Sequence, residues 1–319
     1  MTNLNLWLIG AGKISQNYFC ALKKLNNIPK IIGRGIGSAS NFQKNTGFKV
    51  ETGGLKINLK KYGIPKSAIV AVNNKEALKV AKELIKAGVS RILLEKPGVI
   101  NIEDARLLQN LSKKNKKNKI FIAYNRRFCQ SVIKAKKIIK KDGGILSLNF
   151  DFTEWSDRVK KLDHIGANIK KNWVIANSSH VIDLAFHLCG KPKKWSTWQK
   201  GKMDWHPSAA RFCGSGITNK GIIFSYLSDW EAPGRWGIEL MTTKHRIILR
   251  PIEKLKVIKI KSTDLEPIEI KNNFDIDFKP GFLLQTKAFL LKNDSDLCSL
   301  NSQFDNIKFF NKIAGYRSK

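Results

Sequence analysis

The alternation of short apolar segments with amphipathic segments, from residue 4 to about residue 128, constrains the fold more than any other feature. Apolar runs of strand length occur at residues 4–10, 30–35, 67–72, 91–95 and 119–124. Between them, residues 74–87 and 102–111 repeat apolar side chains at the spacing of a helix. Strands that alternate with helices pack as βαβ units around a parallel sheet. We therefore predict a doubly wound α/β domain over residues 1–125.

The second half has a different pattern. A Lys-rich segment, residues 130–141, predicts one more helix, and Asp142-Gly143-Gly144 then breaks the periodicity. Apolar and polar residues alternate over 145–155, as in a half-buried strand, and strand-like runs follow at 221–230, 236–242, 245–251 and 255–261. Residues 178–188 are the one helix that this region indicates clearly. We predict a second α+β domain, residues 126–319, with a largely antiparallel sheet.

The chain is strongly basic. Its 58 Lys and Arg against 25 Asp and Glu give a net charge of +33 over 319 residues. Such a field attracts polyanions, or an anionic substrate or cofactor. Lysine far outnumbers arginine, however, and is spread along the chain, whereas nucleic-acid readers concentrate charge on one face and supply arginine. A composition rich in Lys, Asn and Ile is typical of an AT-rich genome, and this explains the excess of basic residues. We therefore expect no specific nucleic-acid partner.

The sequence also bears on the compartment. The N-terminus has no basic region before its short apolar run, so it predicts no secretory signal. No segment approaches the roughly 20 apolar residues needed to cross a bilayer, so no membrane association is expected. The five cysteines are odd in number and never form a Cys-x-x-Cys pair. These features predict reduced thiols in a cytoplasmic protein.

A glycine-rich turn follows the first predicted strand directly and begins a helix. It reads Gly10-Ala11-Gly12-Lys13-Ile14-Ser15. In a dinucleotide-binding turn, Gly10 would permit the tight bend, and Gly12 would let a pyrophosphate approach the N–H groups of the helix N-terminus. Ser15 replaces the third glycine but is still small. A P-loop is excluded, because that motif needs glycine at Trp7 and Ser or Thr at Ile14.

The end of the second strand discriminates between the two nicotinamide cofactors. An NAD site would place Asp or Glu there, about 20 residues past the glycines, to bind the ribose hydroxyls. Residues 31–38 contain no carboxylate and offer Arg34, whose guanidinium can bind a 2′-phosphate with two hydrogen bonds. We therefore favour NADP(H). The alternative is NAD(H), with Arg34 only stacking on the adenine.

The strand at residues 91–95 ends in Glu95-Lys96-Pro97. Together with Gly10-Ala11-Gly12 and a later Asp183-x-x-x-His187, it resembles the Gfo/Idh/MocA family, the group of glucose-fructose oxidoreductase and inositol dehydrogenase. The resemblance covers nearly the whole chain in order and spacing. It implies a Rossmann domain and a second α+β domain whose open-faced sheet serves substrate binding and oligomerisation. It also implies a homodimer or homotetramer. The cofactor-binding residues expected on all these grounds are Gly10, Gly12, Lys13, Ile14, Arg34, Ser38, Glu95 and Lys96.

The resemblance also implies an activity. This is hydride transfer between the nicotinamide and a secondary alcohol or ketone of a sugar, polyol or sugar derivative, including nucleotide-linked sugars of surface-polysaccharide synthesis. Two alternatives stay open: an imine reductase of the same family, and a regulator that binds NADP(H) without turnover.

Three side chains of the helix at residues 178–188, His180, Asp183 and His187, share one face because they are three and four residues apart. The expected catalytic residues are Lys96, Asp183 and His187: His187 as general base, Lys96 to polarise the reacting oxygen, and Asp183 to stabilise the ammonium. The sequence does not rank Lys96 and His187. A structural cluster is one alternative, and a metal site is another. We expect no metal, because only His206 could complete the ligand set.

Polar and aromatic residues beyond the last Rossmann strand are candidates for substrate binding. Indole rings suit the C–H face of a sugar, and guanidinium groups suit an anionic group such as a carboxylate or phosphate. The expected substrate-binding residues are Arg126, Arg127, Trp155, Asn177, His180 and Arg235.

Overall fold

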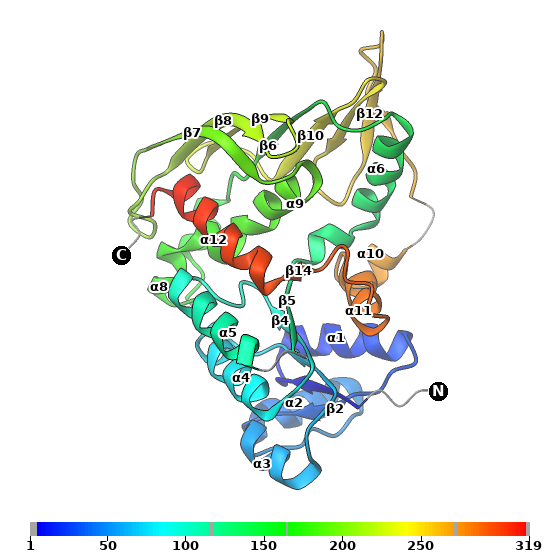
Figure 1. Ribbon diagram of the computed structural model, residues 1–319, viewed down its shortest axis with the longest axis vertical. Helices are drawn as coiled ribbons and strands as arrows, with labels where there is room; N and C mark the ends of the chain where they lie inside the picture. Colours follow the sequence, from blue (N-terminus) through cyan, green and yellow to red (C-terminus); the bar gives the residue numbers. More distant parts are fainter. Residues whose placement is uncertain (1–4, 115–117, 164, 271–272, 317–319) are drawn as a thin grey trace. The chain divides into compact units, whose positions relative to one another are not determined.

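The computed structural model describes residues 5–114, 118–163, 165–270 and 273–316, and it divides the chain into two compact units (Figure 1). The first unit comprises Met1–Tyr124 and Ile276–Asp305, and the second comprises Asn125–Asp275 and Asn306–Lys319. In the described part of the chain, no helix combines the length and the apolar character that crossing a membrane requires. All five cysteines are free thiols.

The first unit contains a parallel sheet of the Rossmann type. Its strand order is β14-β5-β4-β3-β1-β2, and only the edge strand β14 is antiparallel to its neighbour. The strands are β1 (Leu6–Ile9), β2 (Lys30–Ile32), β3 (Ser67–Val70), β4 (Arg91–Glu95), β5 (Lys119–Ala123) and β14 (Cys298–Ser299). The helices between them are α1 (Lys13–Lys24), α2 (Ile36–Thr46), α3 (Gly54–Tyr62), α4 (Asn74–Ala87) and α5 (Ile102–Lys114). The central strands are apolar and almost entirely buried, as expected where helices cover a parallel sheet, and the predicted α/β class is confirmed.

Local sequence explains where these helices begin and end. The side chain of Asn73 accepts a hydrogen bond from the backbone N–H of Glu76 (3.0 Å) and caps the first turn of α4. Gly88 ends the helix in the left-handed conformation, with φ of 89°. Between these ends an apolar stripe that includes Val80 and Leu84 faces the sheet. The helix has the bounds that its periodicity predicts, residues 74–87.

A C-terminal segment returns to the first unit. Within it, α11 (Phe282–Leu290) packs on α1, with the rings of Phe282 and Tyr18 4.7 Å apart. Arg91 forms an ion pair with Asp294 (2.5 Å) and donates a hydrogen bond to the carbonyl of Phe289 (3.1 Å). The expectation of one clear helix after residue 145 is wrong, because α11 and α12 (Leu300–Ala314) are also helical. Residues 282–290 are apolar on nearly every side, so they lack the polar stripe that marks a surface helix.

The second unit contains an eight-stranded sheet of order β13-β12-β11-β10-β6-β9-β8-β7. All neighbouring pairs are antiparallel except β6 and β9, so the largely antiparallel sheet is confirmed. Its strands are β6 (Ser147–Asp151), β7 (Pro192–Lys200), β8 (Arg211–Thr218), β9 (Ile223–Asp229), β10 (Gly237–Met241), β11 (His245–Leu249), β12 (Lys256–Lys259) and β13 (Glu266–Pro267). The remaining helical segments are η1 (Asn125–Phe128), α6 (Gln130–Lys141), α7 (Ser156–Lys160), α8 (Ala167–Lys171), the π-helix η2 (Val174–Ser178), α9 (Ser179–Cys189) and α10 (Phe274–Asp277).

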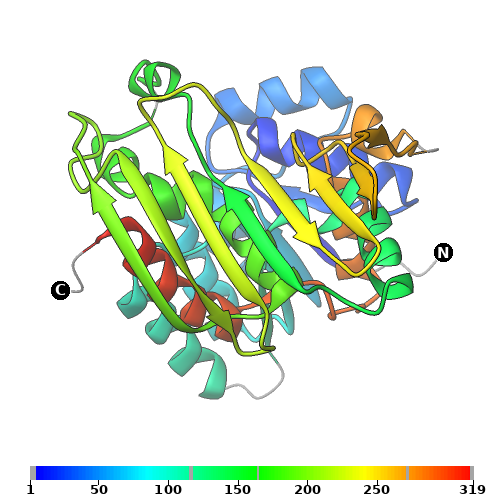
Figure 2. The same ribbon diagram turned by 90° about the horizontal axis from the view of Figure 1, so that it is seen from above.

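The two faces of this sheet differ. On one face the ring of Phe186, on α9, packs edge-on against Phe150 and Phe224 at 5.5 and 5.1 Å. The other face, turned to the viewer in Figure 2, carries none of the described helices of the second unit. The register places four exposed apolar side chains together on that open face: Trp198, Ile217, Ile223 and Leu227.

Candidate dinucleotide and substrate sites

The turn between β1 and α1 requires glycine at its first position. Gly10 has a φ of +119°, and a Cβ atom there would lie 2.2 Å from the carbonyl oxygen of Ala71. The hydroxyl of the buried Ser15 donates a hydrogen bond to the same oxygen (3.2 Å). Gly10 and Ser15 therefore let the turn and the first helix pack directly on the residue that follows β3.

Gly12 has a different role, because it is the N-cap of α1 and no side chain caps that helix. A Cβ atom at Gly12 would meet no atom within 4 Å. The open space therefore lies at a helix N-terminus, where backbone N–H groups and the helix dipole favour a phosphate. This open cradle fits the pyrophosphate of a dinucleotide.

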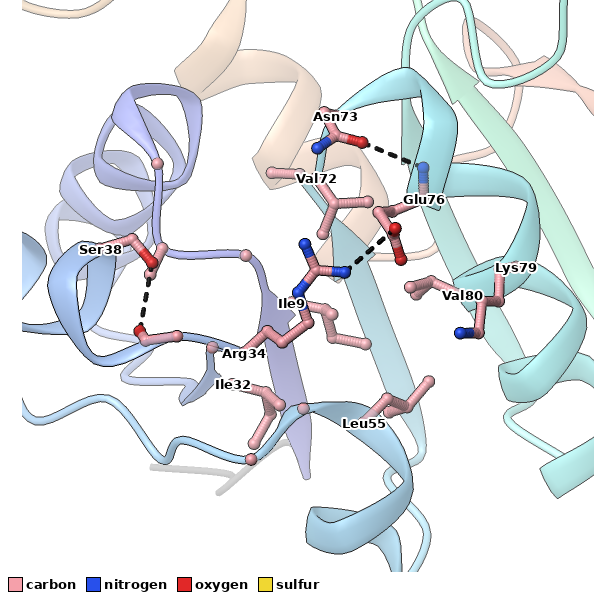
Figure 3. A pocket seen from close by; sticks show the side chains of 18 of the residues that line it. Ile9, Ile32, Arg34, Ser38, Leu55, Val72, Asn73, Glu76, Lys79 and Val80 are labelled. Atoms are coloured by element: carbon pink, nitrogen blue, oxygen red, sulfur yellow. Dashed lines mark hydrogen bonds and ion pairs between the residues drawn. The ribbon is translucent and has the colours of Figure 1, made fainter.

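A cavity of about 610 Å³ opens beside the turn (Figure 3). Ile9, Ile32, Leu55, Val72 and Val80 form its apolar wall. Of the residues predicted to bind the cofactor, four line this cavity: Gly10, Gly12, Arg34 and Ser38. The other four do not line it: Lys13 and Ile14 begin α1, and Glu95 and Lys96 lie at the end of β4.

Arg34 extends from the loop after β2 toward Glu76 on α4, and their side chains form an ion pair of 3.0 Å (Figure 3). Arg34 is 74% exposed and Glu76 is 32% exposed, so water screens this pair and it holds Arg34 only weakly. Lys56 and Lys79 also line the cavity, and Glu83 is its second carboxylate. Glu76 was not predicted as a residue of this site, although its position in the first turn after the Asn73 cap was a usable signal.

The strand end at Glu95 is held from α1. The hydroxyl of the buried Tyr18 donates a hydrogen bond to Glu95 (2.7 Å). Burial raises the pKa of the Glu95 carboxyl, and the nearby cations Lys279 and Lys96 partly oppose that rise. Burial also raises the pKa of Tyr18, and the Glu95 charge adds to this effect. The glycine turn and Lys96 follow strands that run parallel, so both lie at the carboxyl edge of the sheet.

In the second unit, Asp183 is buried in an ion pair with Arg127. Both carboxylate oxygens accept hydrogen bonds from the guanidinium, at 2.7 and 2.6 Å. The side chain of Asn306 donates a third hydrogen bond (2.9 Å). Arg126, the neighbouring candidate, forms an ion pair with Glu253 (3.1 Å). Carboxylates of this unit therefore balance the charges of Arg126 and Arg127, two of the three predicted substrate arginines.

Four predicted substrate residues, Trp155, Asn177, His180 and Arg235, meet around Glu154, which the sequence analysis did not single out. Asn177 (3.0 Å) and Arg235 (2.5 Å) donate hydrogen bonds to its carboxylate. Trp155 is the next residue in the chain, and the ring of His180 lies 5.8 Å from that of Trp236, which also contacts Glu154. A signal was available: Leu148, Phe150 and Phe152 alternate with polar residues, and continuing this alternation places Glu154 on the same face.

The other two histidines considered above lie elsewhere. His187 is half-buried in the last turn of α9. His206 is fully buried, with its ring nitrogens 2.7 Å from the carbonyl of Ala209 and 2.7 Å from the hydroxyl of Tyr316. Burial lowers the pKa of His206 to about 4. Among the described residues, no group of three or more His, Cys, Asp or Glu side chains is arranged to hold a metal ion.

The parallel sheet, its glycine turn and the open helix N-terminus together define a dinucleotide-binding protein of the Rossmann class. Residues 4–124 match the model of the Gfo/Idh/MocA family, described as an oxidoreductase family with an NAD-binding Rossmann fold. Over this domain the resemblance inferred from the residues is confirmed.

No curated protein matches the sequence. Among solved structures, an oxidoreductase from Agrobacterium radiobacter in complex with NAD+, L-tartaric acid and magnesium is 14% identical, with a TM-score of 0.76 over 99% of this chain and 96% of that chain. Levoglucosan dehydrogenase in complex with NADH and L-sorbose is 17% identical (TM-score 0.77, 99% and 97%). UDP-N-acetylglucosamine 3-dehydrogenase GnnA from Acidithiobacillus ferrooxidans is 11% identical (TM-score 0.74, 98% and 96%). At these identities the likeness shows a shared fold over nearly the full chain.

Proposed function

We propose that this protein is an NADP(H)-dependent oxidoreductase that transfers hydride between the nicotinamide and a secondary alcohol or ketone of a sugar, polyol or sugar derivative. The observation that carries the proposal is the cavity at the glycine turn, whose lining includes Arg34, Lys56 and Lys79. Structures of the same fold include levoglucosan dehydrogenase and a dehydrogenase of a nucleotide-linked sugar, which supports this substrate class. The five free thiols suit work in a reducing cytoplasm.

The cavity supports NADP(H) over NAD(H) by its charge. Its lining contains three cations, Arg34, Lys56 and Lys79, against the two carboxylates Glu76 and Glu83. The exposed pair of Arg34 with Glu76 is weak, so a doubly charged 2′-phosphate competes well for the guanidinium. The apolar side chains of Leu55 and Val80 suit the flat faces of an adenine.

In the proposed reaction, the bound nicotinamide supplies or accepts the hydride. Lys96 follows β4 at the carboxyl edge of the parallel sheet, the edge where ligands of such sheets bind. Its ammonium would hydrogen-bond the reacting oxygen and stabilise the charge that develops there. A histidine of α9 would hold the proton that leaves the hydroxyl group.

Two histidines compete for that role, His187 from the sequence pattern and His180 from the structure. His180 lies in the cluster that gathers Trp155, Asn177 and Arg235 around Glu154, and this placement favours His180. Separate His180→Gln and His187→Gln variants decide between them: the acid/base residue is the one whose loss lowers kcat and removes the corresponding pKa from the pH profile.

The function is tested by turnover. We expect purified protein to oxidise or reduce members of a panel of sugars, polyols and nucleotide-linked sugars, followed by NADPH absorbance. Lys96→Ala should lower kcat by about 100-fold or more, because it removes a group that stabilises the transition state, and it should leave NADPH affinity within about twofold. Reduction of cyclic imines but not ketones would favour the imine reductase. NADPH binding without turnover of any substrate would favour the regulator.

A further inference from the structure

The carboxylate of Glu154 is unusual because it is buried and fully engaged. Its side chain is 1% exposed, and burial of a charge is costly unless partners compensate for it. One oxygen accepts hydrogen bonds from Asn177 (3.0 Å), Ser178 (2.7 Å) and the indole N–H of Trp236 (3.2 Å). The other accepts a hydrogen bond from Arg235 (2.5 Å). Hydrogen bonds thus join four donor side chains to the carboxylate of Glu154, and one of these donors, Arg235, carries the opposite charge.

Two of these donors belong to a rare element. Asn177 and Ser178 are the last residues of the π-helix Val174–Ser178, which runs directly into α9. Short π-helical segments are rare and occur often at functional sites. Here the segment presents two consecutive side chains to the same carboxylate oxygen. The backbone therefore departs from a regular α-helix at the residues whose side chains donate hydrogen bonds to Glu154.

Arg235 connects the buried carboxylate of Glu154 to the protein surface. Its guanidinium lies over two indole rings, 4.2 Å from the centroid of Trp236 and 5.0 Å from that of Trp155. The Trp155 indole N–H donates a hydrogen bond to the carbonyl of Gly234 (3.0 Å), which fixes the ring. Trp155 is 51% exposed and Arg235 is 34% exposed. The result is a flat aromatic platform with an oriented guanidinium whose charge Glu154 balances.

We propose that Glu154 is a positioning residue that fixes this platform and makes it select uncharged substrate groups. The inference rests on the proposed function and names the kind of sugar that the site takes. Because Glu154 balances the charge of Arg235, the remaining donors of Arg235 and the face of Trp155 suit hydroxyl groups and the C–H face of a neutral sugar. Arg126 and Arg127 are likewise paired, with Glu253 and Asp183. Arg158 lies over Trp155 at 5.7 Å but is exposed, so water screens its charge.

The first test needs no substrate. Glu154→Gln keeps the shape but leaves Arg235 with an unbalanced charge, which attracts anions to Trp155. We expect quenching of tryptophan fluorescence by iodide, relative to neutral acrylamide, to increase at least about twofold at low salt. Trp198, the other exposed tryptophan (58%), is changed to phenylalanine in all samples so that Trp155 dominates the part of the fluorescence that iodide can quench. The matched control is Glu231→Gln, an exposed carboxylate paired with Arg211 (2.6 Å), which should change nothing.

The second test uses turnover. Glu154→Gln should raise the KM for an uncharged sugar by about tenfold, the range expected for a lost charge-assisted hydrogen bond, with kcat less affected. It should also shift selectivity toward a sugar acid of the same length, and adding Arg235→Gln should abolish that shift. If Glu154→Gln fails to fold, a double variant replaces it. This variant combines Glu154→Gln with Arg235→Gln and buries no unpaired charge. Its KM for the uncharged sugar is compared with the KM of Arg235→Gln alone.

The outcomes separate the two proposals. Unchanged iodide quenching in a folded Glu154→Gln variant, or an unchanged ratio of activities on neutral and acidic sugars, overturns the role of Glu154. Absence of turnover in the wild-type protein, with the quenching change present, overturns the proposed reaction and leaves the charge-balancing role of Glu154 intact.

Discussion

Three arginines that the sequence marks for an anionic substrate group are each paired with a carboxylate. Arg126 pairs with Glu253, Arg127 with Asp183 and Arg235 with Glu154. Sequence reasoning identified the arginines because their residue type is informative. It did not pair them with their carboxylates, which lie 56 to 127 positions away, and it had given Asp183 another role. Ion pairs between distant residues depend on the fold, so composition and local spacing do not reveal them.

His206 shows a similar effect of burial. The sequence offered it as a metal partner, whereas the structure buries it between Ala209 and Tyr316 with its pKa lowered to about 4. The unfolded chain, with a pKa of 6.5 at this histidine, therefore binds more protons than the folded chain between these values. The stability that His206 contributes is fully present above pH 6.5 and is lost as the pH falls toward 4.

The lowered pKa of His206 predicts how the stability of the protein depends on pH. The wild-type free energy of unfolding should fall by about 2 kcal/mol from pH 7 to pH 5 on account of His206 alone. His206→Gln removes the titrating group. The difference in the free energy of unfolding between the wild type and this variant should therefore shrink as the pH falls from 7 to 5. Denaturant unfolding of both proteins at several pH values measures it. A difference that stays constant between pH 7 and pH 5 would show that His206 does not titrate on unfolding.

At the scale of elements, the turn from β1 into α1 separates the two roles of its glycines. Gly10→Ala should lower the free energy of unfolding by about 1 to 3 kcal/mol or more, because it forces a side chain into a positive φ and toward the Ala71 carbonyl. Gly12→Ala should leave stability nearly unchanged, because a Cβ atom there meets nothing within 4 Å. It should still weaken dinucleotide binding by occupying the open cradle.

Thermal melts and cofactor titrations of the two variants provide the measurement, and each variant is the control for the other. Equal stability of Gly10→Ala and the wild type would mean that the turn is not packed on β3 as described. Unchanged affinity of Gly12→Ala would mean that the dinucleotide does not approach this helix N-terminus.

Strong periodicity made most elements predictable. The helices at 74–87 and 130–141 have the predicted bounds, and the five parallel strands fall within the predicted segments. Two kinds of element were not predictable. The segment 282–290 lacks a polar stripe, and the π-helix Val174–Ser178 has no periodicity of its own in five residues. The position of the π-helix matches the buried carboxylate of Glu154, to which its last two side chains donate hydrogen bonds. Only the fold shows this contact.

At the scale of the whole molecule, the open face of the second sheet predicts self-association. The described strands β7, β8 and β9 expose Trp198, Ile217, Ile223 and Leu227 on one face, an apolar surface that is unfavourable in water. We expect a second copy to cover it, in a homodimer or homotetramer. Leu227→Lys should shift the protein toward monomer while the melting temperature of the folded unit changes little.

Multi-angle light scattering at micromolar concentration measures this, with Lys220→Glu as a control for a general change of charge at an exposed position outside the apolar patch. A monomeric wild type would contradict self-association. A variant Leu227→Lys with the same mass as a wild-type oligomer would place the interface elsewhere.

Titration with NADPH and NADH side by side shows whether the cavity at the glycine turn binds NADP(H). The reduced nicotinamide supplies the fluorescence signal. We expect tighter binding of NADPH than of NADH. Arg34→Ala should lower the affinity for NADPH by about tenfold or more and change the affinity for NADH little, because the guanidinium meets only the 2′-phosphate. Equal affinities that Arg34→Ala leaves unchanged would contradict the NADP(H) preference. Absence of binding of either cofactor would contradict the account as a whole.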